Sequence, residues 1–516
     1  MVLAGAGVSL FVFVLYVMTL APTILPYDSP YLLDVPMLQM QVCVLGMTHP
    51  TGYPSYLMLS HLFTYLPFGD CAYRSNLASA SYAALAVAAV FAAGYLLSWR
   101  VVAAAAAALA FGLGTTLWSQ AVMAEVYTLN ALLIALTVLA LLLWREHQRD
   151  RHLLLSAFLV GFCMTNHLTS GLLLPASVLF VALVDWRKLV DVKLVLKGVG
   201  LFLLGLAPYL YLPLRSAMGP PFKANDPTTF ERFWYVVSGG NLRGGFFAFG
   251  PAELPGRLLF YLGHLLDNVH LGLVAVSVAG FVVLYLRDRV VAVFLGFMYF
   301  GWLFHAVEND IPDIQLYFIP TYLVLCLAMA VGFAFLLSEA ESLLERFERV
   351  PKEVAVGTVS VALVLMPLFG VWESYASNDL SGDYRGRQIL EDVAENAARN
   401  ATILHHRSNL YYLVLVEKRR RDLTLVDPFW HNRDIGYADI VWPADVDLAT
   451  ANRLYGTDDF SGVTAAEKAA EKGPVYIINQ EDINPSGLYE AGWRTSQVEG
   501  ALYRLIPPSG QANQGD

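Results

Sequence analysis

The sequence predicts a mainly α-helical membrane protein with about eleven transmembrane helices and a C-terminal α/β domain outside the membrane. Of its 516 residues, 57% are hydrophobic and only 15% are charged. Apolar runs of about 20 residues, the length that crosses a bilayer, recur up to residue 371. After Trp372 the composition changes to mixed charge with short alternating segments. The first two observations exclude a soluble protein, and the third predicts a separate domain.

The apolar runs can be followed along the chain. The first, Leu3 to Ile24, lacks a basic flank and a small-residue cleavage motif, so we expect it to be a retained span. The stretch 152–185 is too long for one helix and short for two. The other runs lie at 73–98, 101–119, 126–144, 196–214, 268–286, 290–307, 315–338 and 354–371.

Basic residues decide how many spans 152–185 contains, because Lys and Arg gather in cytoplasmic loops. With two short spans there, every basic loop falls on the same side. These loops hold Arg145, Arg149 and Arg151; Arg187, Lys188 and Lys193; Arg287 and Arg289; and Arg346, Arg349 and Lys352. This reading places the N-terminus on the cytoplasmic side of a plasma or inner membrane. The long loops 25–72 and 215–257 and the C-terminal domain then lie outside.

The three parts of the chain are a membrane domain (1–371), an outer α/β domain (372–508) and a tail (509–516) with the composition of a disordered segment. Within the first long loop, residues 54–67 form an apolar stretch too short to span, typical of an interfacial helix. In the outer domain we expect a helix over 386–400, followed by strands at 401–406, 423–427, 475–479 and 501–506.

Charge and cysteine content exclude other classes of protein. A net charge of −10 without a long basic run argues against nucleic acid as a partner. The four cysteines show neither zinc-binding spacing nor a disulfide framework. Only Cys43 and Cys71 could meet, and the sequence does not favour that pairing.

Asp28 and His49 are the most informative polar residues of the first long loop. A carboxylate at a membrane boundary is costly unless it faces protein or water, so Asp28 is a candidate functional residue. It could equally open a turn or cap the next helix, with Ser29 and Pro30 in support. His49, in the motif THPTGYP, lies between Pro50 and a turn, which fixes an imidazole for a site or simply shapes the loop.

Further candidates lie where spans begin or end. Glu125 and Tyr127 start the fourth run, and Asn166 and His167 separate the two short spans, where a polar cleft or a hydrogen-bonded packing role would suit them. Arg215 could hold a lipid phosphate by its paired donors. Arg74 could bind phosphate or contact lipid headgroups.

The segment ENDIPDIQLYFIP contains Glu308, Asp310 and Asp313 just before a span. Three carboxylates so close could bind a divalent cation, although Asp310 and Asp313 could instead cap the next helix. No other metal site is expected.

Several motifs together resemble the family of protein O-mannosyltransferase-like membrane proteins. They cover most of the chain: Asp28 in PYDSPY, HPTGYPSYLMLSHLFTYLPFGDCAYRSNLASA from 49 to 80, AEVYTLNALL from 124, TNHLTSGLLLPA from 165, YLPLRSAMGPP from 211 and DIPDIQLYFIP from 310. The resemblance implies a GT-C glycosyltransferase that moves a sugar, such as mannose, from a polyprenyl-phosphate donor to a protein or glycan acceptor at the outer face.

The resemblance also implies that the acidic residue of the first outer loop is catalytic, which corresponds to Asp28. Independently, the chemistry of glycosyl transfer suits Asp28 as the base of an inverting displacement, with Arg215 at the donor phosphate and Arg74 and His167 as further candidates there. The candidates for the cleft are His49, Tyr53, Glu125, Tyr127, Asn166, Asp310 and Asp313. No cofactor is expected beyond the lipid-linked donor and a possible divalent cation. The family commonly reads Asp-Ser-Gly-Glu at Asp28, whereas Pro30 and Tyr31 follow Ser29 here.

Two other classes of protein fit parts of the sequence. A transporter would have an equally apolar core, but it should show ionisable residues near mid-span and paired repeats, neither of which is present. A non-catalytic scaffold would explain the outer domain and tolerate the missing Glu, but it would not need a polar cleft.

The topology can be tested with one introduced thiol. A cysteine placed near Gly462 should react with an impermeant maleimide in intact cells, because the charge distribution places the C-terminal domain outside. Reaction only after permeabilisation would contradict the eleven-span arrangement.

Overall fold

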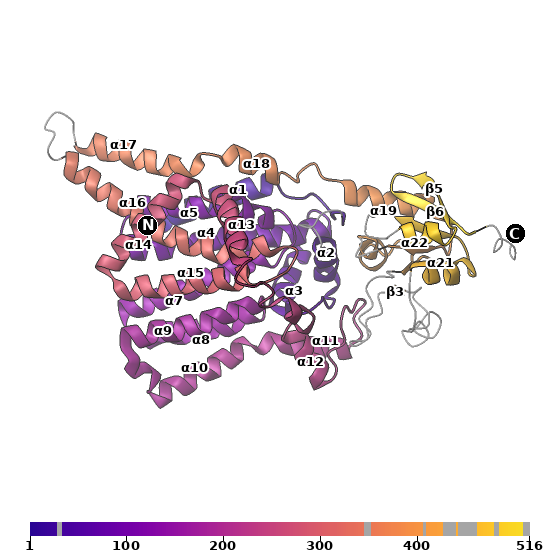
Figure 1. Ribbon diagram of the computed structural model, residues 1–516, viewed down its shortest axis with the longest axis horizontal. Coiled ribbons are helices and arrows are strands. Elements are labelled where there is room, and N and C mark those ends of the chain that lie inside the picture. Colours follow the sequence, from indigo (N-terminus) through magenta and orange to yellow (C-terminus); the bar gives the residue numbers. More distant parts are fainter. Residues whose placement is uncertain are drawn as a thin grey trace.

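The computed structural model places a helical bundle at one end of the molecule and a small α/β domain at the other (Figure 1). It describes residues 1–27, 34–344, 352–405, 409–426, 440–441, 462–478 and 485–508. Asp28 and the tail 509–516 lie outside these residues, as do Arg346 and Arg349.

The bundle supplies the membrane-crossing helices. Among the described residues, six segments are long and apolar enough to cross a membrane, or up to nine if each bent pair is one span. The six lie at Cys71–Ser98 (α4), Tyr127–His147 (α7), Leu168–Leu189 (with α9, Leu173–Asp185), Arg289–Val307 (α15), Ile314–Leu343 (with α16, Ile319–Leu344) and Val356–Asn378 (with α17, Lys352–Leu365, and α18, Val371–Asn378).

The bent pairs are α5–α6, α10–α11 and α13–α14, with bends of 65°, 40° and 104°. Their bounds are Val101–Gly112, Thr115–Ala121, Val192–Gly205, Tyr211–Ala217, Leu254–Asn268 and Leu271–Arg287. The shorter helices α1 (Val2–Met18) and α8 (Asp150–Met164) account for the two other predicted runs. Residues 152–185 therefore hold two helical segments, as the charge distribution predicts, separated by a break at 165–172.

Small residues let two of these helices pack closely. A Cβ on Gly280 of α14 would overlap the backbone carbonyl of Ala328, and one on Gly332 of α16 would overlap that of Val276. Lipid supplies no hydrophobic driving force between helices, so close backbone approach of this kind is a main source of helix association.

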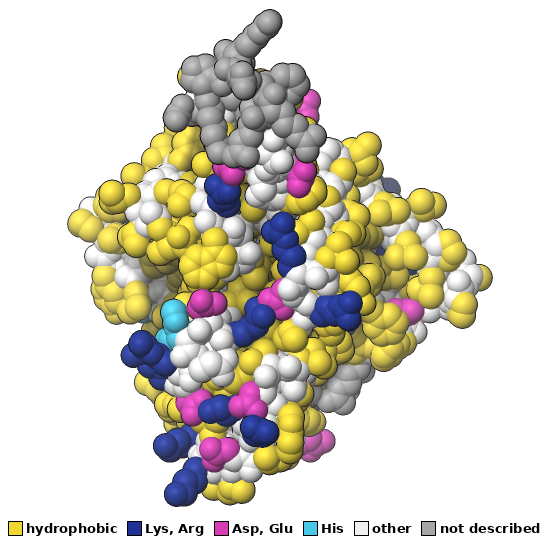
Figure 2. All heavy atoms as spheres, turned by 90° about the vertical axis from the view of Figure 1, so that its left-hand side faces the viewer, with side chains coloured by type: hydrophobic (Ala, Val, Ile, Leu, Met, Phe, Trp, Pro, Cys, Tyr) yellow, Lys and Arg dark blue, Asp and Glu magenta, His cyan; other side chains and the backbone are white. Residues whose placement is uncertain are grey.

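The helix ends that face away from the α/β domain carry charged residues on an otherwise apolar surface (Figure 2). Ion pairs join the connections at this end: Arg100 with Glu341 at 2.8 Å, Lys188 with Asp150 at 2.8 Å, and Arg145 with Asp288. The described basic loops therefore gather at one end of the bundle.

The opposite end carries the short helices of the two long loops. These are α2 (Val35–Val44), α3 (Pro54–His61) and α12 (Phe230–Val237). The expected helix after Pro54 is present, whereas α2 is not apparent from the sequence. Helix α2 brings Cys43 to Cys71 at the start of α4, with a Cα–Cα distance of 6.1 Å, and the two form a disulfide. The expectation that they stay unpaired was wrong.

The C-terminal domain contains a six-stranded mixed sheet in the order β3-β2-β1-β4-β6-β5. The four predicted strands correspond to β1 (Thr402–Leu404), β2 (Thr424–Val426), β4 (Val475–Ile478) and β6 (Leu502–Ile506). Strands β1, β2 and β4 are parallel and buried. Strand β5 (Arg494–Glu499) is polar and largely exposed at the sheet edge, so it lacks the apolar alternation that reveals a strand. The other elements are β3 (Ile440–Val441), α19 (Arg385–Asn396), α21 (Gly462–Ala470) and α22 (Pro485–Glu490).

Candidate functional site

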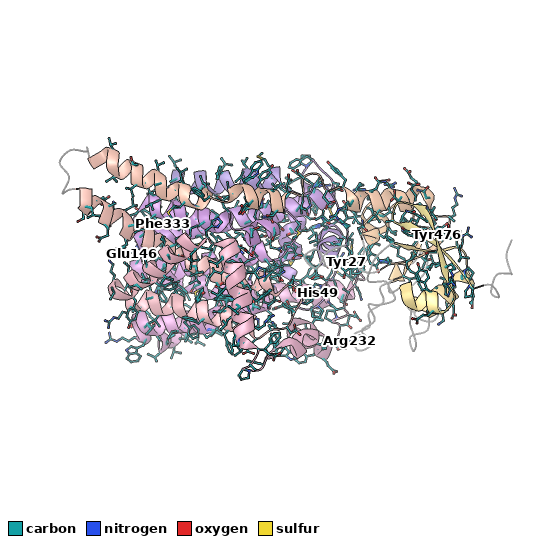
Figure 3. All side chains as sticks on the ribbon, turned by 45° about the horizontal axis from the view of Figure 1, so that its top comes forward. Tyr27, His49, Glu146, Arg232, Phe333 and Tyr476 are labelled. Atoms are coloured by element: carbon teal, nitrogen blue, oxygen red, sulfur yellow. A yellow bond between two sulfur atoms is a disulfide. The ribbon has the colours of Figure 1, made fainter. Side chains whose placement is uncertain are left out.

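Polar side chains from five separate segments meet at the end of the bundle that faces the C-terminal domain. Tyr27 and His49 both lie in this region (Figure 3). Each segment reaches it where a helix begins, ends or breaks. Backbone can leave the helical form at such helix ends, which lie near the membrane boundary, because water or protein can pair the peptide groups there and hydrocarbon cannot.

His49 is held in place by its neighbours. Its Nε2 lies 3.5 Å from a carboxylate oxygen of Asp34 and 3.3 Å from Tyr53 Oη, and its Nδ1 lies 3.1 Å from Thr48 Oγ1. The Gly52 N–H donates to the His49 carbonyl at 2.8 Å, and the positive φ of Gly52 (88°) closes the turn. The motif therefore holds the imidazole in place, one of the two roles that the sequence allows. Its carboxylate partner, Asp34, precedes α2 and makes no capping hydrogen bond.

Two further carboxyl groups lie near this pair. Glu125 is 6% exposed, and its carboxylate accepts a hydrogen bond from the Val126 N–H at 3.2 Å. Asp313 accepts one from the Tyr127 hydroxyl at 2.6 Å. Burial raises the pKa of Glu125 well above its usual range, and the charges of Asp34 and Asp313 raise it further. Burial also raises the pKa of Asp313.

Asn166 and His167 lie between the two short helical segments, as expected. Asn166 donates to the Val126 carbonyl at 3.1 Å, and His167 Nδ1 lies 2.7 Å from Thr169 Oγ1. The His167 ring contacts three tyrosine rings at centroid distances of 5.1–6.2 Å, those of Tyr53, Tyr127 and Tyr317. His167 thus belongs to a buried aromatic cluster, and burial favours its uncharged form.

A cavity of about 320 Å³ opens beside this cluster. Its walls include Tyr53, His167, Phe246, His305, Asn309 and Tyr317. His305 Nε2 and Asn309 Oδ1 are buried without a hydrogen-bond partner among the described residues. No Lys, Arg, Asp or Glu is among the described wall residues. The cavity can therefore offer aromatic faces and uncharged hydrogen-bonding groups to a ligand.

Three of these wall residues, Tyr317, His305 and Asn309, are missing from the sequence prediction. They lie in the same short stretch of sequence as Glu308, Asp310 and Asp313, the three acids that suggested a cation site. Asp310 is exposed. The described part of the chain contains no group of three or more His, Cys, Asp or Glu able to hold a metal ion.

The two predicted phosphate-binding arginines both donate to backbone carbonyls. Arg215 bonds the carbonyls of Leu45 and Val44, at 2.7 and 3.1 Å, at the C-terminal end of α2. Arg74 bonds those of Thr64, Leu66 and Asp70, at 2.5–3.1 Å. In the structure both side chains therefore hold the first outer loop in shape. Their phosphate contacts stay predictions.

Comparison with known proteins shows what the chain resembles. Residues 34–190 match the family model of the N-terminal domain of protein O-mannosyl-transferase TMEM260. The resemblance predicted from the motifs is confirmed. The mouse protein O-mannosyl-transferase TMEM260 is 26% identical over 420 residues, which is 74% of this chain and 57% of the mouse protein. The chain thus spans little more than half the length of this relative.

Solved structures share the fold. ArnT from Cupriavidus metallidurans bound to undecaprenyl phosphate superposes with a TM-score of 0.57 at 13% identity, covering 99% of both chains. AglB, the oligosaccharyltransferase of Archaeoglobus fulgidus, in complex with an inhibitory peptide and dolichol-phosphate, gives 0.50 at 10% identity and covers 99% of this chain and 75% of its own. The predicted GT-C membrane fold with a C-terminal α/β domain is confirmed.

The raised pKa of Glu125 predicts a pH-dependent effect of Glu125→Gln. The folded protein keeps a proton that the unfolded chain releases above about pH 4.3. Stability therefore falls as pH rises toward the folded pKa, by up to about 1.4 kcal/mol per unit. Glutamine is uncharged throughout, so the variant should gain melting temperature over the wild type at pH 8 and much less at pH 5.

Thermal melts in detergent at both pH values measure this difference. Glu373→Gln, at an exposed glutamate, serves as the control and should give the same small change at both. An equal change at the two pH values for Glu125→Gln would contradict the raised pKa.

Proposed function

We propose that this protein is a membrane glycosyltransferase that moves a sugar from a polyprenyl-phosphate donor to an acceptor hydroxyl at the outer membrane face. The sugar is a hexose such as mannose, and the acceptor is a protein or a glycan. The match to an O-mannosyl-transferase family and the structural likeness to ArnT bound to undecaprenyl phosphate support the class of donor. The observation that carries the proposal is the cavity, whose described walls combine aromatic rings with uncharged polar side chains, among them His167, His305 and Asn309.

The cavity suits the sugar rather than the phosphate. Sugar hydroxyls hydrogen-bond to uncharged donors and acceptors and pack their ring faces on aromatic side chains, and the described walls supply both kinds of group. A phosphate would instead need cations or a cluster of donors. The absence of charged side chains from the described walls thus supports a neutral sugar at this position.

The reaction needs a base for the acceptor proton and stabilisation of the departing phosphate. A carboxylate takes the hydroxyl proton while the acceptor oxygen attacks the anomeric carbon, and the bond from that carbon to the phosphate oxygen breaks. Asp28 is our candidate base, and single displacement inverts the anomeric centre. Tyr27, directly before it, lies at the same end of the bundle as His49 (Figure 3).

The outer face is supported by two independent features. The ion-paired, basic connections lie at the far end of the bundle from the candidate site, and basic loops are cytoplasmic. The Cys43–Cys71 disulfide lies at the site end, and disulfides persist in oxidising compartments.

The candidate ionisable residues lie at helix ends rather than mid-span, which favours a transferase over a transporter.

Filling the cavity should block the donor without unfolding the protein. A Cβ on Gly171 would meet only Met164 Cε, at 3.7 Å, so Gly171→Leu can project into the cavity that Gly171 lines. We expect binding of undecaprenyl-phosphate-mannose to weaken about tenfold or more, which corresponds to roughly 1.4 kcal/mol.

The control is Gly296→Leu on α15, where a Cβ meets nothing within 4 Å and which does not line the cavity. It should leave donor binding unchanged. Normal binding by a folded Gly171→Leu protein would remove the cavity from the proposal.

Replacing Asp28 tests the chemistry. Asp28→Asn keeps the size of the side chain but cannot take a proton, so sugar transfer should fall by about 10² or more while donor binding changes little. A helix-capping aspartate tolerates asparagine, so a structural role predicts nearly normal turnover. Transfer and melting temperature measured on one purified sample separate the two. Retained transfer would make Asp34, Glu125 or Asp310 the next candidates.

A further inference from the structure

We infer that Arg387, in the C-terminal domain, is a positioning residue for the active site of the membrane domain. It holds the segment 19–27 that leads from α1 into the first outer loop. The inference rests on the proposed function, because it assigns to the outer domain a role in that reaction.

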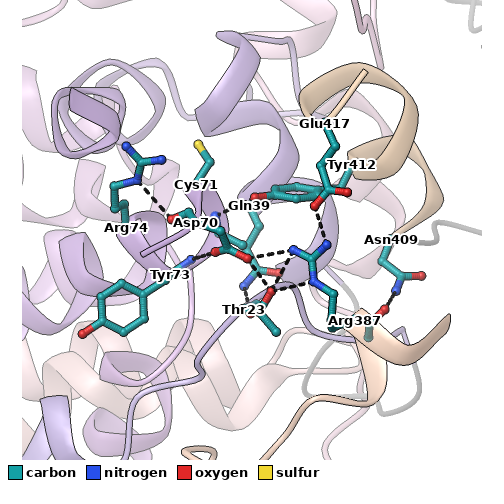
Figure 4. A network of polar contacts seen from close by, with 12 residues as sticks. Thr23, Gln39, Asp70, Cys71, Tyr73, Arg74, Arg387, Asn409, Tyr412 and Glu417 are labelled. Atoms are coloured by element: carbon teal, nitrogen blue, oxygen red, sulfur yellow. Dashed lines mark hydrogen bonds and ion pairs between the residues drawn. The ribbon is translucent and has the colours of Figure 1, made fainter. Parts of the chain in front are cut away.

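Arg387 lies on α19 and joins three separate parts of the chain (Figure 4). Its Nε and one terminal nitrogen donate to Thr23 Oγ1 at 3.3 and 3.1 Å, and the same terminal nitrogen donates to Asp70 at 2.8 Å. The other terminal nitrogen donates to Glu417. Its side chain is 23% exposed, so solvent screens these charge-assisted bonds only partly.

Thr23 is held from the membrane side as well. Its hydroxyl donates to Asp70, and its carbonyl accepts from Gln39 of α2 at 3.3 Å. Gln39 also accepts from the Leu25 N–H at 3.0 Å and donates to Asn76 of α4 at 2.8 Å. Segment 19–27 therefore has partners in α2, α4 and the C-terminal domain.

The C-terminal domain also contacts this segment through its backbone. A Cβ on Gly386 would overlap the carbonyl oxygen of Ile24, so only glycine allows the approach. The Leu380 N–H donates to the Thr19 carbonyl at 3.0 Å. Nearby, the Tyr412 hydroxyl accepts from the Ala72 N–H at 3.1 Å. Arg387 thus lies within a continuous contact, where its bonds fix one geometry.

The same network reaches the candidate site along two routes. Segment 19–27 continues directly into Asp28. Gln39 belongs to α2, which begins directly after Asp34, the partner of His49, and the Cys43–Cys71 disulfide ties α2 to the start of α4 beside Asp70. A shift at Thr23 would therefore displace Asp34 relative to the cavity. Displacements of about 1 Å can lower a rate about 10²-fold.

The alternative is that Arg387 only attaches one domain to the other. The two roles differ in what Arg387→Gln changes. Positioning predicts a kcat at least about tenfold lower, with binding of undecaprenyl-phosphate-mannose unchanged and faster amide hydrogen exchange within 19–27. Simple attachment predicts a lower melting temperature with a normal kcat for the folded protein.

A matched control is available in the same domain. Arg420 is 17% exposed and bonds Asp422 and the carbonyls of Val393, Ala394 and Ala398, all within the C-terminal domain. Arg420→Gln should lower the melting temperature without changing kcat or exchange within 19–27. Asp70→Asn keeps a capping side chain for α4 but weakens the pair with Arg387, so its effect on kcat should not add to that of Arg387→Gln.

The assay uses the full-length protein, undecaprenyl-phosphate-[14C]mannose as donor and host membrane proteins as acceptors. If the wild type transfers the sugar and Arg387→Gln has the same kcat, the inference is overturned and the proposed function stays intact. A loss of kcat with unchanged exchange within 19–27 would have the same consequence. Failure of the wild type to bind or transfer from the donor would overturn the proposed function itself. In that case the exchange measurement still decides whether Arg387 orders the segment.

Discussion

The architecture depends on one constraint, that hydrocarbon offers no hydrogen-bond partner to peptide groups. Backbone can therefore leave the helical form only where protein or water pairs its polar groups, as near the membrane boundaries. The break at 165–172 and the connection between α15 and α16 both lie at the site end of the bundle. Polar side chains can gather there because the local backbone is already irregular, and Asn166 pairs one of its carbonyls, that of Val126. The candidate site is a consequence of where the helices stop.

In the outer loops, charged side chains donate hydrogen bonds to backbone carbonyls that have no partner in a helix. The last carbonyls of a helix have no intrahelical donor, and Arg215 supplies one to the end of α2. Arg74 does the same for the chain around Leu66. From sequence, an arginine at headgroup depth suggests a phosphate, but the structure gives each of these guanidinium groups backbone acceptors. Such pairing orders the loop that carries His49 and Asp34.

Features with a local cause were predictable, whereas features with a distant partner were not. Hydropathy located the helical runs, and the Pro and Gly of the His49 motif indicated a rigid turn. The break at Asn166 and His167 followed from the basic loops, which all fall on one side only if residues 152–185 form two spans. The disulfide was missed because α2, which aligns Cys43 with Cys71, has no strong periodic signal. His305 and Asn309 were missed because single neutral polar residues stand out little in an apolar chain. The Thr23–Arg387 contact joins residues 364 positions apart, and nothing local reveals it.

The electrostatics of the site are consistent with an anionic donor. A polyprenyl-phosphate sugar carries negative charge, and three ionised carboxylates beside it would repel it. Burial raises the pKa of both Glu125 and Asp313, which favours their uncharged forms, while the hydrogen bond from the Tyr127 hydroxyl lowers the pKa of Asp313 by a smaller amount. The charge of Asp34 is offset when His49 is protonated. Burial thereby reduces the negative charge at Glu125 and Asp313. The base that we propose in the first outer loop would then add its negative charge to a site that carries little other negative charge. Repulsion between the site and the departing phosphate would therefore be small.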